Sequence, residues 1–84
     1  MYIKSLQPNI IENDSYLTVM SERTGNLVLK VLDVEGHMAK TVVADVAEGL
    51  QQLALNLSDL GSGNYILNAF NGDVFIKAIR FIKQ

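Results

Sequence analysis

The sequence predicts an all-β fold, an immunoglobulin-like antiparallel β-sandwich of about seven strands, and three observations support this prediction. Apolar residues alternate with polar ones at a period of two rather than 3.6. Turn residues interrupt this alternation roughly every 8–12 residues, the spacing typical of such sandwiches. Of the 84 residues, 49% are hydrophobic and 19% are charged, so enough apolar side chains exist to fill the core of one domain spanning residues 1–84.

The strands follow one another along the chain with short connections. In the first half, Leu17 and Val19 share one face of a strand, and Leu27, Leu29 and Val31 share one face of the next. The same alternation continues in the second half. Seven strands are expected over residues 2–7, 15–21, 26–33, 37–46, 50–57, 63–70 and 73–83.

Turn chemistry marks the connections. The segment Asp33–Gly36 has Asp at the first and Gly at the fourth position, as a type I turn prefers. Asn71-Gly72 is the strongest hairpin signal, because both residues tolerate a positive φ in the centre of a turn. A helix over Val43–Leu53 is the competing prediction for that stretch, but Gly49 and the later Leu alternation favour strands.

Charge and composition exclude several functional classes. The formal net charge of −2 argues against a nucleic-acid or anionic-membrane binder, which needs excess Lys and Arg. No apolar run approaches the ~18 residues of a membrane span, so no direct membrane insertion is expected. Without Cys, the chain has neither disulfides nor thiolate metal ligands.

Reactive groups are scarce, so the sequence predicts neither enzymatic activity nor a cofactor. His37 is the only histidine and follows Gly36 at a predicted turn, where it is expected to be exposed. No nucleophile-elbow motif surrounds any serine. Asp33 and Glu35 could contribute to a calcium site, but no EF-hand loop pattern is present and a solvated turn is the favoured interpretation. No metal site is predicted.

The C-terminal strand is basic. In an unbroken strand, Lys77 and Lys83 point to one side and Arg80 to the other. The pattern alone favours an edge strand protected by charge, since Lys on an edge blocks unwanted pairing. The alternative is a basic, apolar strand displayed to a partner.

Four segments, in order and at suitable spacing, give a resemblance to a known family. Asp59–Leu67 (DLGSGNYIL) resembles the D-L-x-S-G-x-Y-I-L segment of the C-terminal sorting domains of the type IX (Por) secretion system of Bacteroidetes. Val31–Gly36 resembles that family's I-Y-D-x-x-G turn, Lys77–Gln84 its K-x-F-x-K-Q-like ending, and residues 8–19 its P-N-P…L-x-V start. Ile10 and Leu32 depart from the family pattern.

The shared positions have a physical rationale in folding. Gly63 allows a tight entry into a strand, and Tyr65 and Leu67 then point to one face, with the Tyr65 hydroxyl able to reach the main chain. The structural part of the motif consists of Asp33, Gly36, Asp59, Leu60, Gly63 and Tyr65.

The resemblance implies that the chain is the C-terminal domain of a larger exported protein. Its partners would be secretion-machinery proteins, a sortase-like peptidase and a covalently attached upstream cargo, and the domain would be monomeric. It would pass through the periplasm to the outer-membrane surface or the medium. The expected recognition residues are Lys77, Arg80, Phe81 and Lys83. A non-sorting immunoglobulin-like accessory module, a spacer that binds protein or carbohydrate, is the alternative.

Overall fold

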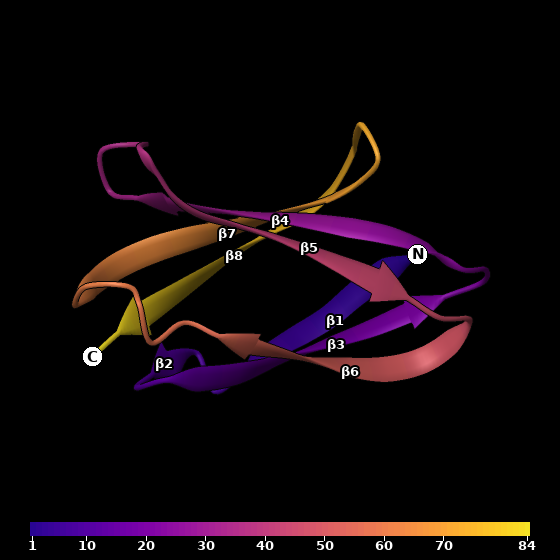
Figure 1. Ribbon diagram of the computed structural model, residues 1–84, viewed down its shortest axis with the longest axis horizontal. Coiled ribbons are helices and arrows are strands. Elements are labelled where there is room, and N and C mark those ends of the chain that lie inside the picture. Colours follow the sequence, from indigo (N-terminus) through magenta and orange to yellow (C-terminus); the bar gives the residue numbers. More distant parts are fainter.

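The computed structural model describes residues 1–84, which form two facing β-sheets and no helix (Figure 1). The eight strands are β1 (Tyr2–Gln7), β2 (Ile10–Ile11), β3 (Asp14–Ser21), β4 (Gly25–Asp33), β5 (Met38–Val46), β6 (Gly49–Asn56), β7 (Gly63–Asn71) and β8 (Val74–Lys83). The three-stranded sheet has the order β1-β3-β6, and the five-stranded sheet has the order β2-β8-β7-β4-β5. The structure contains no helix that is long and apolar enough to cross a membrane.

The all-β sandwich is confirmed, and each of the seven predicted strands is present within one residue of its expected ends. The eighth strand, β2, was not predicted, and it pairs with β8 in parallel, Ile10 opposite Ile82. All other strand pairs are antiparallel. The chain thus passes from β1 in one sheet to β2 in the other, and Figure 1 places the C-terminus beside β2.

The competing helix over Val43–Leu53 is wrong. This stretch completes β5, turns a corner between the sheets and begins β6. Gly49 has a φ of 103°, which suits glycine and breaks a helix. The Gln51 side chain accepts a hydrogen bond from the N–H of Ala47 (2.9 Å) and donates one to the carbonyl oxygen of Ala47 (2.6 Å), so both main-chain groups of Ala47 are satisfied.

One hydrophobic core lies between the sheets. The predicted inward faces are confirmed, because Leu27, Leu29 and Val31 of β4 are fully buried against the opposite sheet. Fifteen apolar residues form this core: Ile3, Leu6, Ile11, Leu17, Val19, Leu27, Leu29, Val31, Val46, Leu55, Leu57, Leu60, Leu67, Ala69 and Phe81. These fifteen are fewer than half of the hydrophobic residues in the chain, and eleven large ones, Val43 and Phe75 among them, remain exposed.

Strand order and one tyrosine give the sandwich its immunoglobulin-like character. Tyr65 lies near the start of β7, the strand after the crossover from the other sheet, and its hydroxyl donates a hydrogen bond to the carbonyl oxygen of Gly61 (2.7 Å). A tyrosine at this corner, bonded to the main chain a few residues upstream, is a hallmark of immunoglobulin-like folds.

The two turn predictions have different outcomes. The Asp33–Gly36 turn is confirmed: the N–H of Gly36 donates to the Asp33 carbonyl oxygen (3.0 Å), and Gly36 has a φ of 84°. The β7–β8 hairpin is also present, but its ends are Asn71 and Val74, so Gly72 and Asp73 occupy the centre. Only Gly72 has a positive φ (59°), as a type II′ turn requires, so a turn centred on Asn71-Gly72 is wrong.

Candidate functional site

The C-terminal strand β8 divides the four predicted recognition residues between surface and core. It pairs with β7 along its whole length, and the two-residue β2 covers only its last part. Lys77 and Arg80 are exposed, whereas Phe81 and Lys83 are buried with 3% and 6% of their surface accessible. In the folded domain, surface recognition can therefore use Lys77 and Arg80, and Phe81 and Lys83 serve packing.

Lys77 lies where the open edge of β8 approaches the other sheet. Its predicted placement on the same side as Lys83 is confirmed, since both residues alternate with Arg80 in a regular register with β7. The Lys77 ammonium donates to the carbonyl oxygen of Ile3 in β1 at 3.4 Å. This lysine combines a cation at the surface with an edge position that discourages pairing with another strand.

Arg80 points away from the core, on the outer face of the five-stranded sheet. It stands opposite Ile66 of β7 and forms no ion pair. Beside it is a shallow groove of about 270 Å³, whose lining includes Val34, Asn64 and Asp33. The groove thus places the Arg80 guanidinium beside an apolar side chain, Val34, and the carboxylate of Asp33.

Phe81 is held by the motif tyrosine. The rings of Tyr65 and Phe81 stack with centroids 5.5 Å apart and planes 18° from parallel. Gly63 starts β7 with a φ of 153°, a conformation that side chains rarely adopt, and it lies opposite Lys83. The predicted roles of Gly63 and Tyr65 in the strand entry are confirmed, and both residues support the C-terminal strand directly.

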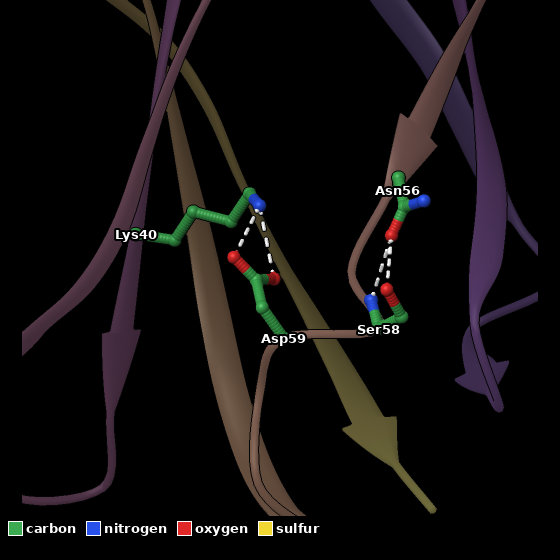
Figure 2. Close-up of polar contacts among 4 residues, drawn as sticks. All are labelled: Lys40, Asn56, Ser58 and Asp59. Atoms are coloured by element: carbon green, nitrogen blue, oxygen red, sulfur yellow. Dashed lines mark hydrogen bonds and ion pairs between the residues drawn. The ribbon is translucent and has the colours of Figure 1, made fainter.

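Asp59 fastens the loop between β6 and β7 to the edge strand β5 (Figure 2). Its two carboxylate oxygens accept hydrogen bonds from the Lys40 ammonium at 2.9 and 2.8 Å. The hydrogen bond from Lys40 lowers the pKa of Asp59, and the charge of Lys83 adds to the effect. Nearby, the Asn56 side-chain oxygen accepts from both the N–H and the hydroxyl of Ser58 (3.0 and 2.6 Å).

This loop explains the rest of the motif Asp59–Leu67. Leu60 follows Asp59 directly and enters the core with 8% of its surface accessible. The N–H of Leu60 donates to the carbonyl oxygen of Leu57 at 3.1 Å, which closes the loop. The motif therefore contains a charged clamp, a buried anchor and a hydrogen-bonded tyrosine within a few residues.

The sequence did not predict Lys40 as the partner of Asp59, because the two residues are 19 positions apart and share no local pattern.

The Asp33 turn holds the only histidine. One Asp33 carboxylate oxygen accepts hydrogen bonds from the N–H groups of His37 and Glu35, each at 2.9 Å. These bonds, that from His37 first, lower the pKa of Asp33. His37 is exposed as predicted. Its Nδ1 lies 3.7 Å from a carboxylate oxygen of Asp33 and 3.6 Å from a carboxylate oxygen of Glu35. No group of three His, Cys, Asp or Glu side chains comes together as metal ligands would.

Comparison with known proteins adds no relative. No protein-family model, curated protein or solved structure matches the chain.

Proposed function

We propose that this domain is a C-terminal sorting domain, recognised by the type IX secretion machinery to carry an upstream cargo across the outer membrane. The observation that supports the proposal is the segment Asp59–Leu67. Its family-like residues form the clamp to β5, the buried anchor and the tyrosine corner, whose ring stacks on Phe81 of β8. The domain acts by being recognised and has no catalytic role. A sortase-like peptidase then acts near its start, and the cargo reaches the cell surface or the medium.

Within β8, the recognised groups are Lys77 and Arg80. They are the members of the predicted set whose side chains are exposed, and they lie on different sides of the strand. A partner that contacts both must therefore reach the outer face of the sheet and its open β8 edge. Phe81 and Lys83 keep the strand in place beneath them.

Burial in β8 dictates how the proposal must be tested. Deleting Arg80–Gln84 would remove the buried Phe81 and the pairing of Ile82 with β2, so lost export could reflect unfolding. The sharper variant is Lys77→Glu/Arg80→Glu. Its charge-matched control is Lys4→Glu/Arg23→Glu, which changes two exposed residues away from β8.

The assay fuses residues 1–84 to a reporter with an N-terminal export signal in a host that has the type IX machinery. The unaltered domain and the Lys4→Glu/Arg23→Glu control should carry the reporter into the medium, and Lys77→Glu/Arg80→Glu should leave it in the periplasm. Retention with the unaltered domain would overturn the sorting proposal. Full export of a folded double variant would overturn only the choice of residues.

The second candidate is a non-sorting accessory module that binds protein or carbohydrate. Two tyrosines support it, since Tyr2 and Tyr16 are exposed on the outer face of the three-stranded sheet with 55% and 47% of their surface accessible. Aromatic rings of this kind can stack on sugars. Binding of soluble polysaccharides to the domain, abolished by Tyr2→Ala or Tyr16→Ala, would favour this candidate over sorting.

A further inference from the structure

The outer face of the five-stranded sheet carries apolar side chains where a solvated sheet would carry polar ones. Two cross-strand rows run over β5, β4, β7 and β8. The first row contains Val43, Val28, Phe70 and Phe75, and the second contains Met38, Leu32, Ile66 and Arg80. The row between them is mixed and contains Thr41, Lys30, Asn68 and Ala78. We call the two rows and Lys30 the apolar outer face. An antiparallel sheet exposed to water normally alternates apolar inside with polar outside, so these rows need an explanation.

A bulge in β8 completes the first row. The register between β7 and β8 shifts between Ala69 and Phe70, which leaves Ile76 as an extra residue in β8. Lys77 consequently lies on the inner side, while Phe75, two residues earlier, lies on the outer side. Phe75 packs edge-on against Phe70, with ring centroids 5.6 Å apart. The bulge turns a large aromatic ring outward, where 54% of its surface is accessible.

The charges on the apolar outer face are unbalanced. Lys30 stands over the Phe70 ring at 4.9 Å from its centroid, and neither Lys30 nor Arg80 forms an ion pair. Asp45 lies opposite Asn26 at a corner of the sheet and forms no ion pair with either cation. Neither cation is paired within the domain, although Asp33 lines the same groove as Arg80. A protein that covers both cations would therefore have to supply carboxylates of its own.

The size of this face suits a protein surface. The whole outer side of the four strands, including the mixed row between the apolar ones, covers about 20 Å by 30 Å at the usual strand spacing and rise. This approaches the ~800 Å² that each partner contributes to an interface of standard size. A second copy related by a two-fold axis is disfavoured, because its two apolar rows would offer Lys30 and Arg80 further cations and no carboxylate.

We infer that the apolar outer face is a docking surface for a different protein, one that presents an apolar patch with carboxylates placed to meet Lys30 and Arg80. The apolar rows supply contact area and the cations supply orientation and specificity. The inference does not depend on the sorting proposal, because it concerns binding by the domain alone.

The test selects binders from a displayed library of random peptides on the 84-residue domain. Enriched peptides should combine aliphatic or aromatic residues with Asp or Glu. Synthetic versions should shift the NMR signals of residues on the outer sides of β4, β5, β7 and β8. Lys30→Glu should weaken binding roughly tenfold or more, and exchanging the peptide carboxylate for Lys should restore binding to that variant.

A matched pair of variants separates this face from general surface effects. Val43 and Leu50 are each 65% accessible, but Leu50 lies on the three-stranded sheet. Val43→Lys should abolish peptide binding and Leu50→Lys should leave it unchanged, with both variants melting near the unaltered domain. Three results would overturn the inference: no enriched peptide, binding that Lys30→Glu and Val43→Lys do not affect, or self-association of the domain that Val43→Lys abolishes.

Discussion

Substitution of Phe81 by Ala separates folding from recognition within β8. The ring is 3% accessible and stacks on Tyr65 at a centroid distance of 5.5 Å. Removing it leaves a cavity in the core and a tyrosine ring without its partner. Arg80, the preceding residue, points to the other side of the sheet and contributes little to the core.

The expected loss can be worked from burial. Phe→Ala in a core costs about 3–5 kcal/mol, and stacking contributes about 0.5–1.5 kcal/mol of such a pair's stability. A domain of this length has a total stability of about 4–13 kcal/mol at ordinary values per residue. Phe81→Ala therefore removes a large part of the free energy of unfolding, whereas Arg80→Ala should change it by less than about 0.5 kcal/mol.

Equilibrium urea denaturation measures this difference. The chain has no Trp, so far-ultraviolet circular dichroism is the suitable signal. With a slope of about 1 kcal/mol per molar urea for a small domain, the Phe81→Ala midpoint should fall by about 3 M or more. A loss below about 1 kcal/mol, or a similar loss in Arg80→Ala, would refute the assignment of Phe81 to the core.

Three further predictions follow from the loop and turn geometry. Tyr65→Phe removes the hydroxyl bonded to Gly61 and should cost about 0.5–1.5 kcal/mol in urea denaturation; no change would contradict the corner's role. Gly36→Ala forces a side chain into a φ of 84° and should lower the free energy of unfolding by about 1–2 kcal/mol. Gly61→Ala, at a residue without a positive φ, should leave this free energy unchanged, and equal effects of the two substitutions would contradict the turn. The folded-state pKa values of Asp33 and Asp59 are lowered, so their contribution to stability is present above pH 3.8 and is lost as the pH falls through the lowered values. Melting temperatures measured from pH 5 to pH 2 should consequently fall less steeply in Asp33→Asn/Asp59→Asn than in the unaltered domain, and identical slopes would contradict the two hydrogen-bonded carboxylates.

Much of the fold could be predicted because alternation is a local signal. Leu27, Leu29 and Val31 are separated by one residue each, so their shared inward face is visible from the sequence. β2 was missed because a strand of two residues, Ile10 and Ile11, is too short to show a period. Its existence depends on pairing with Ile82, which is distant in the chain.

The site was harder to predict because β8 depends on tertiary context. Alternation placed Lys77 and Lys83 on one side, but it could not show that this side faces the core at Lys83 and an open edge at Lys77. Strict alternation would put Phe75 on the same side as Lys77, but the bulge at Ile76 turns Phe75 to the outer side of the sheet. No residue pattern in the sequence marks this bulge. The Lys40–Asp59 clamp likewise joins residues that only the folded chain brings together.

The most direct test of the central claim is the fraction of a signal-bearing reporter that residues 1–84 carry outside a cell with the type IX machinery. We predict that the reporter fused to this domain accumulates in the medium or on the cell surface, and that the same reporter without it stays in the periplasm. Equal distributions of the two reporters, with the fused domain shown to be folded, would contradict the sorting function.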